Sequence, residues 1–295
     1  MASASGGVVT KSCTALPREG NPLPRLYMQS IPPTSSHPAH RMSINSTGLA
    51  NQGLAAYALY GQMHPPALRP KPYVVSVAGV AYGENVKMVH TLQTDSHTDI
   101  DAIELNLSCP NIAGKPQVGY DFEATREVLR QVLATRADAC DQYGCTSKTD
   151  SATVRRIPIG LKLPPYLDQS HFKSIAEVLD DVLSELAFVT CINSLGNGFV
   201  YQQHEPSETG PSFTPAIAPN DGFGGIGGAL VKPFGLANVR ALHRELPSLP
   251  LIGCGGVCTA QDVKEYLAVG ASLVQVGTAL MHEGPGVFGR LIGEE

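Results

Sequence analysis

The segment ELNLSCPN, residues 104–111, places a cysteine between two asparagines at the end of an apolar, strand-like run. Free cysteine often packs as a small core hydrophobe. Here, however, four polar side chains fall within six positions: Asn106, Ser108, Cys109 and Asn111. Such a cluster is hard to satisfy in a dry core and favours a strand end where a ligand meets the protein. An ordinary thiol has a pKa of about 8.5, so a thiol at such a strand end needs only a modest pKa shift to exchange a proton near neutral pH.

Other apolar runs along the chain also end in polar or glycine residues. Seven such runs span residues 6–13, 73–79, 102–109, 157–165, 188–194, 251–256 and 273–280. Helical patterns separate several of them, at residues 84–92, 121–136, 170–186, 236–246 and 259–270. The last pattern opens with Thr259 and closes with Gly270, which predicts an N-cap and a C-cap. Apolar runs that alternate with helices predict a parallel sheet buried on both faces.

A doubly wound sheet and a (β/α)8 barrel both fit this alternation. The positions of the candidate functional residues decide between the two folds. Candidate functional residues fall at the carboxyl ends of the predicted strands: Lys11, Asn106, Cys109, Lys162, Asn193, Ser194, Gly255, Gly256, Gly277 and Thr278. One site fed by many strand ends is typical of a barrel. The sequence therefore predicts an α/β chain folded as a (β/α)8 TIM barrel, with seven of its eight strands visible.

Composition excludes several classes of partner. The 295-residue chain has a net charge of -5 and no basic run, so we expect no nucleic acid partner. It has no run of about 20 apolar residues and no secretory signal pattern, so we expect no membrane partner. An odd number of cysteines, seven, indicates reduced thiols and a cytoplasmic location.

Two cysteine pairs loosely resemble metal-ligand spacings, Cys140/Cys145 and Cys254/Cys258. No histidine lies at a matching offset, so we predict no metal site.

Eight ordered stretches resemble the dihydroorotate dehydrogenase family. They are KSCTALPREGNPLPR (11–25), SINSTGLAN (43–51), ELNLSCPNIAGKPQVGYDFE (104–123), GLKLPPYLD (160–168), CINSLGNG (191–198), GFGGIGG (222–228), GCGGV (253–257) and VQVGTALMHEGPGVF (276–288). The cysteine of NLSCPN and the run GKPQVGYDFE resemble the class 1A branch, whose members are soluble homodimers that pass electrons to fumarate. The resemblance implies an FMN-binding barrel that oxidises (S)-dihydroorotate to orotate in de novo pyrimidine biosynthesis, with fumarate reoxidising the flavin.

The same resemblance implies roles for individual residues. Cys109 becomes the base that removes the C5 proton of dihydroorotate. Substrate binding is implied for Lys11, Asn45, Gly48, Leu49, Asn106, Asn111, Asn193 and Ser194. FMN binding is implied for Lys11, Ser12, Asn106, Lys162, Ile192, Gly228, Cys254, Gly255, Gly256, Gly277 and Thr278. These residue types suit the implied ligands. Asparagine amides can donate to and accept from the amide groups of the orotate ring, and a fixed cation favours reduction of the flavin. Glycines let backbone N–H groups approach a phosphate.

Some family features have no counterpart in the chain. The family's first strand, which ends in N-A-[A/S]-G, is not matched, and its last helical segment is shortened to GRLIGEE. We therefore expect a barrel without its first strand and C-terminal helix. Residues 1–295 are predicted to form one barrel domain with insertions near 29–41, 136–156 and 201–220, the second of them without helical periodicity.

Two other functions remain open. The chain could be an inactive barrel that only binds or scaffolds, or a dehydrogenase of a related dihydropyrimidine. Those dehydrogenases resemble the family around NLSCP, but they lack the NIAGKPQVGYDFE continuation and carry iron–sulfur cysteine arrays. The intact set of candidate catalytic positions favours a working dihydroorotate dehydrogenase.

Overall fold

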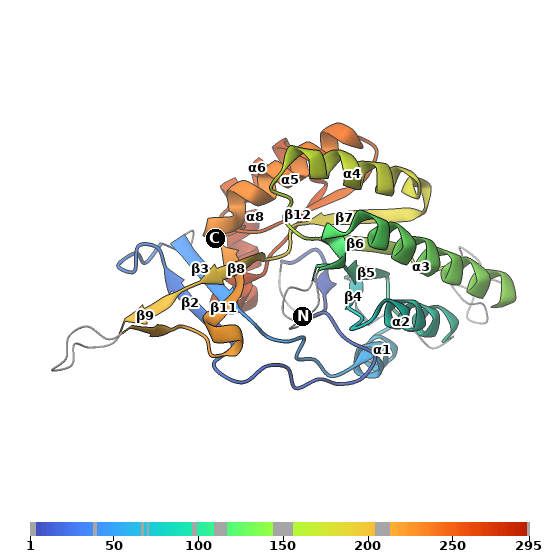
Figure 1. Ribbon diagram of the computed structural model, residues 1–295, viewed down its shortest axis with the longest axis horizontal. Coiled ribbons are helices and arrows are strands. Elements are labelled where there is room, and N and C mark those ends of the chain that lie inside the picture. Colours follow the sequence, from blue (N-terminus) through green and yellow to red (C-terminus); the bar gives the residue numbers. More distant parts are fainter. Residues whose placement is uncertain are drawn as a thin grey trace.

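The computed structural model describes residues 4–37, 40–65, 68–69, 71–95, 99–108, 117–143, 156–203 and 213–293. Its main sheet holds parallel strands in the order β1-β4-β5-β6-β7-β12-β13. Each predicted apolar run supplies one of them: β1 (Val8–Val9), β4 (Tyr73–Val77), β5 (Ala102–Asn106), β6 (Ile159–Leu163), β7 (Leu186–Cys191), β12 (Leu251–Cys254) and β13 (Leu273–Gln275). Figure 1 shows these strands at the centre with the helices outside them, as in a (β/α)8 barrel.

Helices lie between and after the strands along the chain, and each contributes side chains to the hydrophobic core. They are α1 (Leu54–Met63), α2 (Tyr82–Thr94), α3 (Phe122–Tyr143), α4 (Gln169–Asp180), α5 (Lys232–Glu245), α6 (Ala260–Ala268), α7 (Thr278–Glu283) and α8 (Val287–Ile292). The predicted N-cap of α6 is present, since Thr259 and Asp262 form a reciprocal capping box. Gly270, with a φ of 111°, follows its C-terminal end as predicted.

The structure corrects the expected ends of two helices. Residues 136–143, predicted as aperiodic, continue α3, and the rest of that segment up to residue 155 lies outside the described residues. Arg136 and Ala139 are both buried on this part of α3, and Arg136 Nη2 lies 3.1 Å from Oε2 of Glu185, so the helix packs against its neighbours beyond the predicted end. Helix α4 ends at Asp180 rather than at residue 186, because Leu186 begins strand β7.

A second, antiparallel sheet was not predicted from the sequence. Its order is β2-β3-β11-β8, with bounds β2 (Leu26–Ser30), β3 (Arg41–Asn45), β11 (Phe223–Gly228) and β8 (Leu195–Phe199). A hairpin of β9 (Tyr201–Gln203) and β10 (Phe213–Pro215) lies beside it, inside the segment predicted as an insertion at 201–220. Figure 1 shows this second sheet to one side of the barrel strands.

The GFGGIGG run is mainly a strand, β11 (Phe223–Gly228), and not a loop. A Cβ atom on Gly224 would lie 2.6 Å from the backbone oxygen of Asn45, and one on Gly225 would overlap the Ser194 side chain. Glycine is required there because β11 packs so closely against its neighbours. Only the end of the run, Gly227 and Gly228, reaches the cavity described below.

One hydrophobic core joins the two sheets and the helices. It extends from Cys13 after β1 to Leu291 in α8 and includes Ile44 and Ile226 of the second sheet. Because the second sheet shares this core, its loops are held at a fixed position over the parallel strands. None of the helices in the described ranges is both long and apolar enough to cross a bilayer.

Candidate active site

One cavity lies where the carboxyl ends of the parallel strands meet the second sheet. Its wall contains most of the predicted site residues: Lys11, Ser12, Asn45, Leu49, Asn106, Lys162, Ile192, Asn193, Ser194, Gly228, Cys254, Gly255, Gly256, Gly277 and Thr278. These residues are up to 267 positions apart in the chain, from Lys11 to Thr278. Their convergence on one wall follows from the parallel strands, which all end at the same edge of the sheet.

Three predicted residues are not among these wall residues. Cys109 and Asn111 lie outside the described residues. Gly48 is not part of the cavity wall but belongs to the turn before Leu49, where both residues have positive φ values of 65° and 56°. Arg18 Nε donates to the Gly48 carbonyl over 3.3 Å, so Gly48 shapes the turn that presents Leu49.

A chain of hydrogen bonds fixes the polar floor of the cavity. Asn106 Nδ2 donates to Ser12 Oγ over 2.9 Å, and Ser12 Oγ lies 2.9 Å from Ser76 Oγ. Asn193 Nδ2 donates to Asn106 Oδ1 over 3.2 Å and to the Ser108 carbonyl over 2.8 Å. The Ser108 backbone N–H donates to Asn106 Oδ1 over 3.0 Å. The network therefore anchors the backbone one residue before Cys109, the predicted base.

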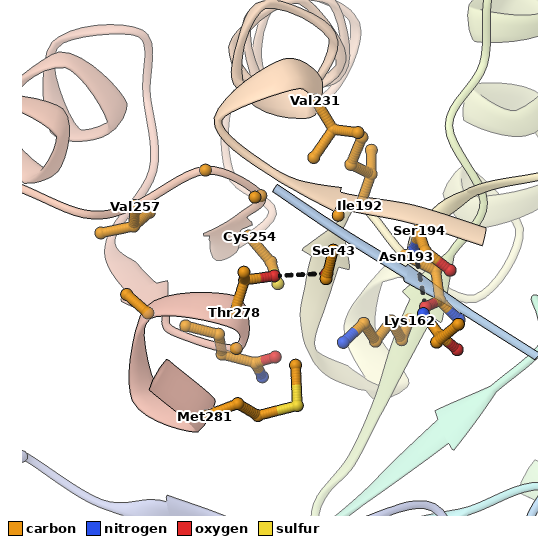
Figure 2. Close-up of a pocket in the computed structure, with 18 of the residues that line it drawn as sticks. Ser43, Lys162, Ile192, Asn193, Ser194, Val231, Cys254, Val257, Thr278 and Met281 are labelled. Atoms are coloured by element: carbon orange, nitrogen blue, oxygen red, sulfur yellow. Dashed lines mark hydrogen bonds between the residues drawn. The ribbon is translucent and has the colours of Figure 1, made fainter. Parts of the chain in front are cut away.

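Lys162 extends from β6 into this cavity (Figure 2). Burial alone would lower the pKa of its ammonium, but the thiolate form of Cys254 and the carboxylate of Glu104 oppose that effect and leave the pKa above its ordinary value. The pKa of the Cys254 thiol is raised, chiefly by burial, while Lys162 acts in the opposite direction. Lys162 is thus a fixed positive charge, and Cys254 a neutral thiol, at neutral pH.

Glycine turns form the part of the wall suited to an anion. Gly255 and Gly256 follow β12 with φ values of 124° and 68°, which non-glycine residues rarely adopt. A Cβ atom on Gly256 would lie 2.9 Å from the Gly228 carbonyl oxygen, whereas one on Gly277 would meet only open space. Backbone groups at these turns can therefore approach a ligand closely, as phosphate-binding loops do.

The Gly255 turn is supported from behind by Tyr266 of α6. The fully buried tyrosine hydroxyl donates to the Gly255 carbonyl over 2.7 Å. Its ring occupies space left by Gly253 and Gly235, because a Cβ atom at either position would overlap it. The tyrosine thereby holds the glycine turn in place without contacting the cavity itself.

Sequence reasoning missed several residues of the wall, among them Ser43 and Gln275. Ser43 lies two positions before Asn45 on β3, so the two side chains share a face of the strand. Its hydroxyl lies 2.9 Å from Thr278 Oγ1, which ties β3 to the start of α7 (Figure 2). Gln275 could have been found as the single amide in the apolar run LVQV.

Lysine, amide and glycine residues at the strand ends surround one cavity of a parallel barrel. This arrangement is typical of the ligand sites of TIM-barrel enzymes. The family model for dihydroorotate dehydrogenase matches residues 1–294. The chain belongs to the dihydroorotate dehydrogenase family, as its motifs predicted.

Relatives with this family name span most of the chain. Dihydroorotate dehydrogenase (fumarate) of Trypanosoma cruzi is 43% identical over 294 residues, covering 99% of this chain and 81% of the relative. Dihydroorotate dehydrogenase A (fumarate) of Lactococcus lactis subsp. lactis is 41% identical over 295 residues, covering 99% and 82%. A crystal structure of the Eimeria tenella enzyme in complex with ferulenol, at 20% identity and a TM-score of 0.70, covers 98% of this chain and 75% of that one and shares its fold.

Replacing Tyr266 with phenylalanine tests the support of the glycine turn. The change leaves the Gly255 carbonyl without its donor, so we expect the free energy of unfolding to fall by about 1–3 kcal/mol. Amide hydrogen exchange at Gly256 and Val257 should also accelerate. Urea unfolding and exchange mass spectrometry measure the two effects. Tyr143→Phe, at a partly exposed ring at the end of α3, should change neither; equal behaviour of the two variants would contradict this role.

Proposed function

We propose that the chain oxidises (S)-dihydroorotate to orotate in de novo pyrimidine biosynthesis, with FMN as its cofactor and fumarate as the final electron acceptor. The observation that carries the proposal is the gathering of Lys11, Asn106, Lys162 and Asn193 on one cavity wall in a chain 43% identical to an enzyme named dihydroorotate dehydrogenase (fumarate). No feature of the described cavity favours a scaffold or another dihydropyrimidine as substrate.

The cavity wall fits FMN in charge and in shape. Gly255, Gly256 and Gly277 would hold the phosphate through backbone N–H groups, since open space at Gly277 admits an anion next to the backbone. Lys162 would face the part of the flavin on which negative charge grows during reduction. When bound there, FMN supplies the acceptor for the hydride from C6 of the substrate.

The chain's own residues would bind the substrate and move its proton. The cavity-lining amides of Asn45, Asn106 and Asn193 both donate and accept, which suits the alternating N–H and C=O groups of the orotate ring. Lys11, on the same wall, supplies a cation for the carboxylate. Cys109 would take the proton from C5, so that loss of this proton and of the C6 hydride leaves the C5=C6 double bond of orotate. The anchored Ser108 limits how far the base can move.

Cys109→Ala tests the reaction and the base together. The purified wild-type chain should carry a flavin spectrum that dihydroorotate bleaches without oxygen. The alanine variant should keep the flavin but bleach about 10²–10⁴-fold more slowly, because a positioned base contributes that much to the rate. Stopped-flow absorbance measures both. Cys109→Ser should retain weak activity with its optimum at higher pH, since the hydroxyl is a poorer base.

Cys140→Ala is the matched control, because Cys140 lies on α3 and not on the cavity wall. It should bleach at the wild-type rate. Near-normal bleaching of Cys109→Ala at neutral pH would remove the cysteine from the mechanism. A wild-type protein without flavin, or one whose flavin dihydroorotate leaves unchanged, would overturn the proposed function itself.

Lys162→Met tests the cofactor role of the cation. Loss of a charge-assisted contact should weaken FMN binding about 10- to 100-fold and lower the flavin reduction potential, with a smaller effect on dihydroorotate affinity. FMN fluorescence titration and a dye-coupled potential measurement give the two values. Lys264→Met removes an exposed lysine of α6 and serves as the control. Unchanged FMN affinity and potential in Lys162→Met would refute the assignment.

We propose a cytoplasmic homodimer of one-domain chains, since a single core joins residues from Cys13 to Leu291. Four exposed aromatic rings, linked in a row by pairwise ring contacts, lie at the tip of the second sheet and its hairpin: Phe223, Phe199, Tyr201 and Phe213. An exposed aromatic cluster of this kind is typical of a protein interface.

Sedimentation equilibrium should give about twice the chain mass of 31.2 kDa for the wild type. Replacing Tyr201 and Phe213 together with serine should shift the equilibrium toward the monomer, because the change removes two apolar rings from the cluster. Leu68→Ser, at another exposed apolar side chain, should leave the mass unchanged. A monomeric wild type would contradict the homodimer, and a dimeric double variant would exclude the aromatic cluster as its interface.

A further inference from the structure

Glu104 is a buried carboxylate inside the barrel that the proposed reaction does not use. It lies on β5 two residues before Asn106 and is 1% exposed. Two donors converge on one of its oxygens: Thr190 Oγ1 at 2.8 Å and Gln275 Nε2 at 2.7 Å. Acidic residues are rarely buried this deeply unless a partner compensates their charge. The position therefore requires an explanation beyond packing.

The strand register places Glu104 on the same inner face as Lys162. On β5 and β6, Asn106 pairs with Lys162, and on β6 and β7, Lys162 pairs with Thr190. Residues paired across parallel strands share a face, and so do residues two apart on one strand. Glu104, Lys162 and Thr190 thus all point into the barrel, with Glu104 one layer below the cavity floor.

Electrostatics agree with this placement. The Glu104 carboxylate is one of the groups that raise the pKa of the Lys162 ammonium, and it also raises the pKa of the Cys254 thiol. Gln275, which donates to Glu104, itself lines the cavity together with Lys162 and Cys254. The hydrogen bonds from Thr190 and Gln275 fix the position of the Glu104 carboxylate, and so they also fix its electrostatic effect on Lys162.

We propose that Glu104 is a positioning residue: held by Thr190 and Gln275, it is the buried counter-charge of Lys162 and limits how strongly that lysine favours the reduced cofactor. With Glu104 present, the interior charge near Lys162 is balanced. Without it, the cavity gains one net positive charge, and a bound flavin becomes easier to reduce and harder to reoxidise. The cofactor part of this inference rests on the proposed function, whereas the charge balance does not.

The apoprotein offers a readout that needs no flavin. The Cys254 thiol lines the cavity, and its pKa reports the local charge. The other titratable groups that act with it are Cys191 on β7 and Tyr266 on α6, and burial raises the pKa of both. Cys254 itself adds to the rise in both pKa values, so each group is harder to ionise once Cys254 has lost its proton. Iodoacetamide alkylation of the apoprotein across a pH series, with the Cys254 peptide quantified by mass spectrometry, gives the thiol pKa.

Glu104→Gln keeps the size of the side chain and removes its charge. We expect the Cys254 pKa to fall, because the Glu104 carboxylate is one of the groups that raise it. In the FMN-loaded protein, the reduction potential should rise by about 30 mV for each tenfold gain in relative affinity for the reduced flavin. Lys162→Met should move both values in the opposite direction.

Thr190→Val is the control that separates charge from packing, because it deletes one hydrogen bond to Glu104 but retains the carboxylate. It should move the Cys254 pKa and the potential much less than Glu104→Gln does, even if both variants lose stability. Equal shifts in the two variants, or an unmoved Cys254 pKa in a folded Glu104→Gln protein, would overturn the proposal. If the chain binds no flavin, the proposed function fails, and the thiol titration still decides the role of Glu104.

Discussion

Parallel pairing of β5, β6 and β7 is the constraint on which the rest of the site depends. The register Asn106 to Lys162 to Thr190 sends three polar side chains from neighbouring strands to one face. A shift of one residue in any strand would turn its polar group toward the helices and an apolar group into the cavity. The dense apolar packing between sheet and helices opposes such a shift, since Leu105, Leu161 and Val189 are fully buried on the other face. The packing of the core therefore also determines where the polar side chains of the site lie.

Much of the barrel could be predicted from the sequence because its strands are apolar and its helices periodic. All seven predicted strands are present, and Thr259 caps α6 as its position before an amphipathic segment indicated. The helix end near residue 136 was misjudged, because a buried arginine that pairs with Glu185 looks like a surface residue in the sequence. Ion pairs between elements distant in sequence leave no local pattern.

The second sheet shows a different limit of sequence reasoning. Strand β11 consists largely of glycine, so it carries neither the β-branched residues nor the alternation that identify a strand. Its glycines are explained only by neighbours far away in the chain, such as Asn45 and Ser194. For the same reason Ser43 was missed while Asn45 was found: a resemblance of motifs supplied Asn45, and only the strand itself shows that Ser43 shares its face. Glu104 was overlooked because its partners, Thr190 and Gln275, lie 86 and 171 positions further along.

The two walls of the cavity belong to different sheets, and this separation bears on how such a site can diversify. Lys162 and the buried Glu104 lie on parallel strands. Asn45 lies on the antiparallel sheet, and the turn before Leu49 follows that sheet's strand β3. Insertions in the antiparallel sheet or its hairpin can reshape the face turned toward a substrate ring without disturbing the charges inside the barrel. Substitutions in the parallel sheet can then change electron transfer, and substitutions in the antiparallel sheet can separately change selectivity for the substrate ring.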